Sequence, residues 1–401
     1  MATTKTTLPA GWRWAKLGDV TRVVAGTTPK SGVSEYWEGG DIVWITPTDL
    51  GGNSEKEITL SARRITKAGY ESCGLEIVPT GSVVLSSRAP IGYLGIARVP
   101  LCTNQGCKSF VPSEKVTSEY LYFALKQAVP TLQKLGSGAT FAEVSKTQLE
   151  NFEIPLPPLT EQQRISVWLN EQMAAVAQAR QAAEAQLRAA RELPSADLRE
   201  VFESQEAKKW SKHRLGDILK LRKEVIHPYD KPKGKTIFVG LEHIESHTGI
   251  RISSVDVEMS NLTGRKPKFY KGDIVYGYLR PYLNKVWVAE FDGLCSVDQY
   301  VYEINDEKAN TDFVAWFMRS PVYLERAPID TTPGQLPRIR TDEVASVEIN
   351  LPPVNEQNKI AVEINERLEN TKNLKQSLEA QLAEINQLPS ALLRRAFAGE
   401  L

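Results

Sequence analysis

Two long stretches of the chain carry apolar residues at intervals of three and four positions. In the first stretch these residues are Ile165, Leu169, Met173, Val176, Ala179, Ala183, Leu187 and Ala190. In the second they are Ile360, Ile364, Leu368, Leu374, Leu378, Leu382 and Ile385, with Thr371 on the same stripe. Such spacing places one apolar stripe along a helix, as in the seam of a coiled coil. We therefore predict one long helix in residues 156–205 and another in residues 351–401.

Each predicted helix follows a pair of prolines, in "PLPPLTEQQRI" (155–165) and in "NLPPVNEQNKI" (350–360). Thr160 is predicted to cap the first helix, with Gln163 completing a capping box, and Asn355 is predicted to cap the second. Prolines further along, at positions 194 and 389, are predicted to end or kink the helices. Each helix would then have about 34 residues and a length of roughly 50 Å.

The first stripe is rich in alanine, whereas the second is rich in leucine and isoleucine. Small residues opposite large ones interdigitate closely, so the two helices are predicted to pair with each other as an antiparallel coiled coil. The alternative is that each helix folds back on the globular region that precedes it.

The rest of the chain, residues 1–155 and 206–350, consists of short β-branched runs bounded by turn residues, with a few amphipathic helices. The strand-like runs of the first region are 41–50, 82–87 and 93–99, and those of the second are 236–244, 273–279 and 285–291. The predicted fold class is α+β, with two mixed domains that each precede a long helix.

The chain repeats itself with an offset of 195 positions. "EAQLRAARELPSADLREVF" (184–202) matches "EAQLAEINQLPSALLRRAF" (379–397), and the two proline-bounded helix starts match as well. Earlier in each half, "KLGDV" (16–20) matches "RLGDI" (214–218). The sequence therefore predicts a duplicated domain-plus-helix with internal pseudo-twofold symmetry.

Composition and charge narrow the function. The 401 residues are 41% hydrophobic and 24% charged, and no apolar run is long enough for a membrane span. The four cysteines form no C-x-x-C pair and are predicted to be reduced thiols of a cytoplasmic protein, without a zinc site. The formal net charge is zero, which argues weakly against simple electrostatic binding of nucleic acid, but local basic runs such as 208–223 stand out.

Several motifs in duplicated order resemble one known family across essentially the whole chain. They are "LPAGWRWAKLGDV" (8–20), "SRAPIGYLGIA" (87–97) followed by "CTNQGCKSFVP" (102–112), "RPYLNKV" (280–286), "LLRRAFAGEL" (392–401) and the two helix starts. In this order they resemble the specificity (S) subunit of type I restriction–modification enzymes. The resemblance implies two target recognition domains that each read one half of a split, asymmetric DNA site.

The same resemblance implies that the helices set the spacer between the half-sites and dock two methyltransferase subunits, which restriction/translocase subunits join. It implies no cofactor in this chain, because the S-adenosylmethionine, ATP and Mg of the family are used by the partner subunits. Partner contacts are expected from the helix starts and their first seam residues: Thr160, Gln163, Ile165, Leu169, Asn355, Ile360 and Ile364.

Candidate DNA contacts are basic or amide side chains in loops and at strand ends, where they can reach phosphates or base edges. In the first domain they are Arg63, Arg64, Lys67, Arg88, Asn104 and Gln105. In the second they are Lys231, Lys233, Lys235, Arg265, Lys266, Lys268, Arg280, Tyr282, Arg338 and Arg340. Each could instead belong to a solvated surface, and Asn104 and Gln105 also suit a turn.

No catalytic motif is present in the sequence. It contains no [DN]PP[YF] motif for adenine methylation, no GxxxxGK[ST] loop for ATP, and only four histidines. The sequence therefore predicts a DNA-recognition subunit that is not itself an enzyme. The competing hypothesis is a coiled-coil scaffold that carries two protein-binding modules and does not recognise DNA.

Overall fold

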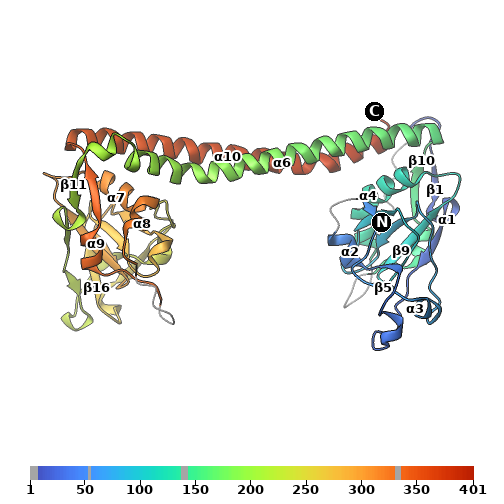
Figure 1. Cartoon of the computed structure of the whole chain (residues 1–401), viewed down its shortest axis with the longest axis horizontal. Coiled ribbons are helices and arrows are strands. Elements are labelled where there is room, and N and C mark those ends of the chain that lie inside the picture. The colour runs from blue at the N-terminus through green and yellow to red at the C-terminus, as the bar shows by residue number, and fades with distance from the viewer. Residues whose placement is uncertain (1–7, 53–55, 137–142, 330–335) are drawn as a thin grey trace. The chain divides into compact units, whose positions relative to one another are not determined.

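The computed structural model describes residues 8–52, 56–136, 143–329 and 336–401. The chain divides into two units, Met1–Ala182 with Leu382–Leu401 (unit 1) and Ala183–Gln381 (unit 2). Helices α6 (Leu159–Glu203) and α10 (Val354–Ala398) each contribute one part to both units. The units are described separately below (Figure 1).

Unit 1 combines two sheets, a strand pair and short helices. A five-stranded sheet has the order β2-β9-β6-β7-β4, with strands Thr21–Ala25, Cys107–Pro112, Val83–Ser86, Leu94–Ala97 and Glu57–Ile58. A three-stranded sheet has the order β5-β3-β8, with strands Arg64–Ile65, Ile42–Ile45 and Leu101–Thr103. Strands β1 (Arg13–Lys16) and β10 (Glu153–Leu156) pair antiparallel. The helices are α1 (Leu17–Val20), α2 (Pro47–Gly52), α3 (Lys67–Glu71), α4 (Ser118–Leu135) and α5 (Lys146–Glu150).

Unit 2 repeats this plan with a larger second sheet. The order β12-β20-β17-β18 joins strands Leu219–Leu221, Gln299–Ile304, Ile274–Gly277 and Val286–Val288. The order β13-β16-β19-β14-β15 joins Val225–Ile226, Lys266–Phe269, Gly293–Cys295, Lys235–Val239 and Val255–Glu258. Strands β11 (Ser211–Arg214) and β21 (Glu348–Leu351) pair antiparallel. The helices are α7 (Thr311–Arg319), α8 (Pro321–Arg326) and α9 (Thr341–Ser346). The predicted α+β class and the internal repeat are confirmed.

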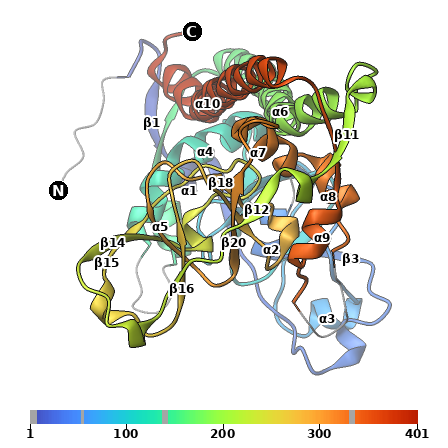
Figure 2. The ribbon, with the colours of Figure 1, turned by 90° about the vertical axis from the view of Figure 1, so that its left-hand side faces the viewer.

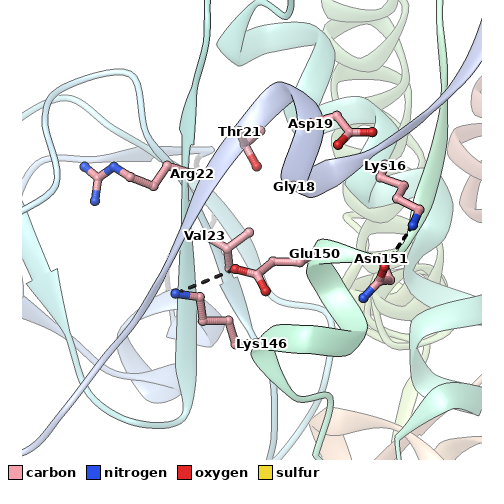
Figure 3. A pocket seen from close by; sticks show the side chains of 9 residues that line it. All are labelled: Lys16, Gly18, Asp19, Thr21, Arg22, Val23, Lys146, Glu150 and Asn151. Atoms are coloured by element: carbon pink, nitrogen blue, oxygen red, sulfur yellow. Dashed lines mark hydrogen bonds and ion pairs between the residues drawn. The ribbon is translucent and has the colours of Figure 1, made fainter.

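The repeated "LGD" motif has a packing role in both units. A Cβ atom on Gly18 would lie 3.1 Å from the carbonyl oxygen of Glu150 in α5. A Cβ atom on Gly216 would lie 2.9 Å from the Cβ of Ala345 in α9. Glycine at these positions lets the motif approach the short helix closely. In unit 1 the motif borders an open cavity of about 510 Å³, whose Lys16 ammonium donates to Asn151 Oδ1 at 3.0 Å (Figure 3).

The long helices begin before the predicted cap residues, so the capping role assigned to Thr160 and Asn355 is wrong. The carbonyl of Pro158 already accepts from the amides of Glu161 and Gln162, at 2.9 and 3.0 Å. The carbonyl of Pro353 accepts from the corresponding amides of the second helix, at 2.8 and 3.0 Å. Thr160 and Asn355 therefore lie inside the first turn, where their side chains cannot act as N-caps.

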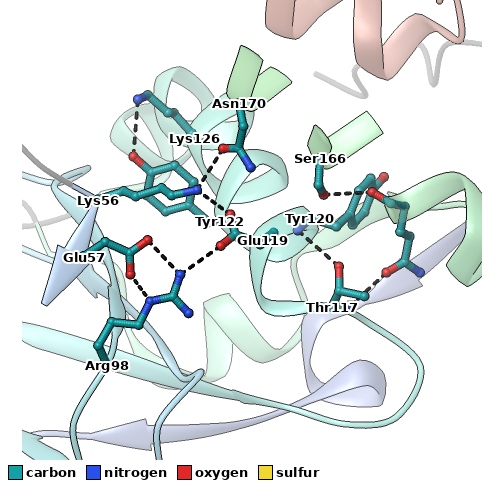
Figure 4. Close-up of polar contacts among 11 residues, drawn as sticks. Lys56, Glu57, Arg98, Thr117, Glu119, Tyr120, Tyr122, Lys126, Ser166 and Asn170 are labelled. Carbon is teal, nitrogen blue, oxygen red and sulfur yellow. Dashed lines mark hydrogen bonds and ion pairs between the residues drawn. The ribbon is translucent and has the colours of Figure 1, made fainter. Parts of the chain in front are cut away.

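A buried glutamine next to each predicted cap ties the helix start to its domain. Gln162 is fully buried. Its Oε1 accepts from the amide of Thr117 at 3.0 Å, and its Nε2 donates to the carbonyls of Lys115 and Pro157, both at 3.0 Å. Thr117 is in turn the N-cap of α4 and accepts from the amide of Tyr120 (Figure 4). The glutamine therefore connects the starts of two helices.

Gln357, 195 positions later, makes the same three bonds in unit 2. Its Oε1 accepts from the amide of Asn310 at 2.8 Å, and its Nε2 donates to the carbonyls of Lys308 and Pro352, at 3.3 and 2.8 Å. Asn310 is the N-cap of α7. The joint between domain and long helix is thus built identically in both units.

The prolines at 194 and 389 were predicted to end or kink the helices, and they do not end them. Both α6 and α10 continue to a length of 45 residues with the proline inside. Beyond the prolines, Leu198 and Phe202 are buried in the core of unit 2, and Leu393 and Phe397 in the core of unit 1. This packing offsets the loss of about 3 kcal/mol that an interior proline causes.

The seam residues near each helix start pack on the preceding domain as well as on the other long helix. In unit 1, Ile165 and Leu169 share one core with α4 and with Phe397 from the end of α10. In unit 2, Ile364 from the start of α10 shares a core with α7 and with Phe202 from the end of α6. Helix starts meet helix ends in each unit, so the two helices run antiparallel, and both predicted modes of packing occur.

Candidate nucleic-acid interface

The two units present different side chains at equivalent places of one framework. In unit 1, β6 pairs antiparallel with β9 so that Leu85 lies opposite Lys108. In unit 2, β17 pairs antiparallel with β20 so that Tyr276 lies opposite Tyr300. Lys108 and Tyr300 are therefore equivalent positions.

The residues that follow β6 and β17 extend this equivalence. Ser87 and Tyr278 are each the first residue after the strand. The next residue in each unit makes a β-bridge, Arg88 with Glu143 and Leu279 with Arg338. We call these two sets, Ser87–Arg88–Lys108–Glu143 and Tyr278–Leu279–Tyr300–Arg338, the matched site of each unit.

In unit 1 the matched site is closed around a buried lysine. The Lys108 side chain is only 7% exposed. Its ammonium donates to Ser87 Oγ at 3.2 Å, to the carbonyl of Gln105 at 3.1 Å and to Glu143 Oε1 at 3.2 Å. All three donors of the ammonium are thus satisfied. Arg88, one-third exposed, lies 3.9 Å from Glu143 Oε2, so its guanidinium is the cation that this site presents to solvent.

The amides predicted beside this site are engaged in the loop. Asn104 Oδ1 accepts from the amide of Gly106 at 2.9 Å, which is turn chemistry. Gln105 Oε1 accepts from the hydroxyl of Thr28, although the residue itself is exposed. Of the two, the structure leaves Gln105 at the surface.

In unit 2 the matched site is an aromatic pair surrounded by arginines. The rings of Tyr278 and Tyr300 stack, with centroids 4.3 Å apart and planes 19° apart. Arg265 and Arg338 lie close enough to Tyr278 to influence its pKa, which burial and then Asp298 raise and the two arginines lower. Burial is also the main cause of the raised pKa of Tyr300. Both phenols therefore remain neutral at neutral pH. The Tyr300 hydroxyl donates to the carbonyl of Ile339 at 3.3 Å, so among the described residues Tyr278 is the phenol of the pair whose donor no such bond occupies.

The loop after Tyr278 adds a third arginine in a strained backbone conformation. Arg280 has φ +53° and precedes Pro281, a combination that is sterically unfavourable for a non-glycine residue. Its amide donates to the carbonyl of Pro337 at 2.7 Å, which holds the loop against the segment that carries Arg338. Tyr282 is 49% exposed on the same loop. Strain of this kind commonly marks a functional site.

The structure therefore gathers three of the predicted arginines, at 265, 280 and 338, around the tyrosine pair. Arg340 lies nearby in sequence, and its amide donates to Glu343 Oε2 at 2.7 Å at the start of α9. Tyr278 and Tyr300 themselves were missed by sequence reasoning, because tyrosines in strands are usually core or neutral surface residues.

The other basic candidates of unit 1 lie on the side of the unit away from α6, around α3 and β5 (Figure 1). The Arg63 guanidinium stacks on the Trp37 ring at 3.7 Å. Arg64 is exposed in β5, and Lys67 lies 3.7 Å from Glu71 in α3. These three side chains provide an exposed basic surface rather than a closed site.

In unit 2 the candidate lysines surround strands β14, β15 and β16, away from the long helices (Figure 2). Three are already engaged. Lys235 lies 3.6 Å from Glu258, Lys266 lies over the Phe238 ring at 5.0 Å, and Lys268 donates to the Tyr270 hydroxyl at 2.7 Å. Lys231 and Lys233 are exposed in the loop before β14.

An exposed aromatic pair beside these lysines was also missed. The rings of His227 and Tyr229 stack at 4.5 Å, and Tyr229 is 74% exposed. An aromatic residue among lysines in a proline-containing loop is the sequence signal that could have identified it, because bases stack on such rings.

Part of the basic run 208–223 forms ion pairs within the chain. Arg222 makes a bidentate ion pair with the buried Asp273, with both N–O distances at 2.8 Å. Lys220 lies 3.2 Å from Glu303, and Lys209 lies 2.7 Å from Glu206. The run therefore contributes less to an interface than its composition indicated.

The expected partner contacts need correction. Ile165, Leu169 and Ile364 are buried in the cores of their own units, and Ile360 packs against the same core. The three buried side chains are therefore not at the surface of their units, whereas Ile360 is half-buried and stays a predicted contact. Thr160, Gln163 and Asn355 are exposed and remain possible contacts.

Reactive sites of other kinds are not found in the described ranges. All four cysteines are free thiols, and burial raises the pKa of Cys102, Cys107 and Cys295 to about 12. The described residues contain no cluster of three or more side chains suited to a metal ion. Among them no helix has both the length and the apolar character needed to cross a membrane.

Comparison with known proteins identifies one family. Residues 9–179 and 207–384 both match the type I restriction modification DNA specificity domain. The MjaIX specificity subunit of Methanocaldococcus jannaschii is 42% identical over 165 residues, which cover 41% of this chain and 38% of that subunit. The EcoDI specificity subunit of Escherichia coli is 25% identical over 318 residues, covering 71% of this chain and 70% of that subunit. The chain thus spans well under half of the length of the first of these relatives.

Solved structures show the same fold. One solved structure aligns with a TM-score of 0.73 at 19% identity, covering 99% of this chain and all of the other. Its description concerns complex assembly and conformational transition of the type I R-M system. The HsdS subunit of Thermoanaerobacter tengcongensis aligns with a TM-score of 0.66 at 19% identity over the whole of both chains.

Proposed function

Because this chain belongs to the family of type I restriction modification DNA specificity proteins, we propose that it is the DNA sequence-recognition subunit of such a complex. Each globular domain binds one half of a bipartite, asymmetric DNA site. The family membership does not favour the alternative of a scaffold without DNA recognition.

The matched site carries this proposal. Two domains with the same strand register and the same helix joint present Arg88 beside a neutralised lysine in unit 1, and stacked tyrosines with Arg265 and Arg338 in unit 2. An arginine can make two hydrogen bonds to guanine or contact a phosphate, and a neutral phenol can donate to base acceptors. Different side chains at one framework position would read different half-sites.

The long helices would set the spacer and dock two methyltransferase subunits, which restriction/translocase subunits join. In this proposal S-adenosylmethionine, ATP and Mg act in those partner subunits, and this chain needs none of its own. The complex would act on DNA in the cytoplasm. Exposed residues of α6 and α10, such as Gln163 and Leu374, are available for such docking.

The test is a map of methylated adenines by single-molecule sequencing of a genome that carries the complete system. We expect a bipartite motif with two different halves. Replacement of residues 1–155 by the first domain of another family member should change one half only. Methylation without a bipartite motif, or a change in both halves, would contradict the proposal.

A gel shift at several salt concentrations separates the alternative. The purified chain with its methyltransferase subunit should shift a fragment that carries the mapped motif, and should not shift a fragment with one half scrambled. Equal binding of both fragments would favour a scaffold with nonspecific affinity.

A further inference from the structure

Unit 2 contains a cavity of about 740 Å³ that no step of DNA recognition uses. Its walls come from the parts of α6 and α10 that belong to unit 2, from α7 and α8, and from the segment around residues 245–250. Leu198, Leu324, Leu368 and Trp316 supply apolar surface, and Arg319 supplies a cation. A cavity of this size and mixed character is typical of a binding site.

Arg319 is a buried cation that makes no direct ion pair with a carboxylate among the described residues of its unit, although Asp312, on the same helix, acts on it electrostatically. It is 8% exposed. Its Nε donates to the carbonyl of Val286 at 2.9 Å, and its guanidinium lies over the Trp316 ring at 4.2 Å. Burial lowers its pKa to about 10, so it keeps its charge at neutral pH. A buried charge usually requires an opposite charge.

The backbone around Arg319 is adapted to it. Gly249 has φ +69°, and a Cβ atom at this position would collide with Arg319 Nε and with the carbonyl of Val286. Only glycine allows the segment to close over the guanidinium. The arginine is therefore a built part of the cavity wall rather than a surface side chain that happens to fold inward.

The remaining charges lie at the rim. The carboxylates that line the cavity belong to exposed residues, and two of them already accept hydrogen bonds, Glu369 from Lys372 at 3.2 Å and Glu245 from Thr248 at 2.7 Å. Lys375 adds a further half-buried cation. The interior of the cavity thus favours an anion, whereas its rim is close to neutral.

The corresponding place in unit 1 carries different polar contacts. Lys126, 193 positions before Arg319, donates to the Tyr122 hydroxyl at 3.3 Å. Beside it, Lys56 donates to Glu119 at 2.6 Å and to Asn170 at 2.8 Å (Figure 4). In unit 1 the neighbouring Lys56 thus forms a direct ion pair with Glu119, whereas in unit 2 Asp312 acts on Arg319 without a direct ion pair.

We propose that the cavity of unit 2 receives an acidic side chain of the methyltransferase subunit, which pairs with Arg319. The assignment rests on the proposed function, because it takes its partner from there. Two observations favour a protein over a small anion. Both long helices form the wall, and Ile250, at the rim, and Ile252, two residues on, are 47% and 62% exposed. Exposed apolar residues beside a charged cavity are typical of protein interfaces.

The test uses two matched substitutions on the surfaces of the long helices. Ser195 lines the cavity from α6 and is exposed, so Ser195→Trp obstructs the cavity without entering a core. Ser390→Trp places the same residue at the position of the repeat 195 residues later, on α10 in unit 1, where the residue is also exposed. Arg319→Gln removes the charge. Each full-length variant is mixed with purified methyltransferase subunit and examined by native mass spectrometry and titration.

We expect the unchanged chain and Ser390→Trp to bind two copies of the methyltransferase subunit. Ser195→Trp and Arg319→Gln should bind one copy normally and the second at least about tenfold more weakly, because the buried charge pair is lost. Binding of specific DNA should be unchanged in Ser195→Trp.

Three results would overturn the site. The first is undiminished binding of two copies by Ser195→Trp, and the second is equal loss in Ser195→Trp and Ser390→Trp. The third concerns acetate as a small anion. If acetate raises the unfolding temperature of the unchanged chain but not that of Arg319→Gln, and Arg319→Gln still binds both methyltransferase copies, the cavity is a small-anion site. If the unchanged chain binds no methyltransferase at all, the proposed partner itself fails, and that outcome is distinct from the other three.

Discussion

The joint between each domain and its long helix depends on one buried glutamine, and this makes a sharp prediction. Gln162 accepts from one backbone amide and donates to two carbonyls, all at 3.0 Å. Gln162→Ala removes the three bonds together and leaves the amide of Thr117 without its acceptor. The N-terminus of α4 should then open more readily.

The expected cost can be worked from these bonds. An unsatisfied, partly buried polar group costs roughly 1–3 kcal/mol, so a loss of about 2 kcal/mol in local stability is expected. Since about 1.4 kcal/mol corresponds to a factor of ten, amide exchange at the start of α4 should accelerate about 25-fold. The same substitution at Gln357, which makes equivalent bonds, should have the same effect at the start of α7.

The predicted acceleration is checked by hydrogen exchange with mass spectrometry. The peptides to follow cover residues 115–125 and 308–318. Gln163→Ala is the control, because Gln163 is exposed and its neighbour's bonds stay intact. It should change exchange by less than about twofold. Acceleration below threefold in Gln162→Ala, or equal acceleration in Gln163→Ala, would refute the account of the joint.

Three further predictions follow from the site and the helices. Arg338→Ala should relax base preference in one half-site only, measured by methylation mapping, whereas Arg88→Ala should affect the other half only. One heptad inserted into both α6 and α10 lengthens each by about 10 Å, or roughly three base pairs, and should change the spacer but not the half-site sequences. In the native protein at pH 8, iodoacetamide should label Cys73 and spare the other three thiols, because burial keeps them protonated; rapid labelling of Cys295 detected by mass spectrometry would argue against this.

The long helices were predictable because their periodicity is a property of the local sequence. Their ends were not. The prolines at 158 and 353 offer carbonyls that begin the helix before the residue that looks like a cap. Pro194 and Pro389 look like helix ends until the burial of Leu198 and Leu393 beyond them is known. Local backbone hydrogen bonds set the helix starts, and tertiary packing carries the helices past the later prolines.

The candidate site was predictable only as a set of separate residues. Arg265, Arg280 and Arg338 come together because β16, β17 and the segment before α9 meet in the fold. Lys108, a charged residue in a strand, gives no sign in the sequence that Glu143 and Ser87 will bury and neutralise it. Contacts between residues far apart in the chain are absent from local patterns, so the chemistry of the site needed the structure.

The two units preserve some residues of their common plan and not others, and the difference separates scaffold from readout. Gln162 and Gln357 make equivalent bonds, and Gly18 and Gly216 face equivalent short helices, α5 and α9. At the matched site the strand register is kept while a lysine becomes a tyrosine, as Lys108 and Tyr300 show. A role in folding alone would constrain both places alike. Different side chains at equivalent positions of a retained strand register are what two domains would need in order to recognise two different DNA sequences.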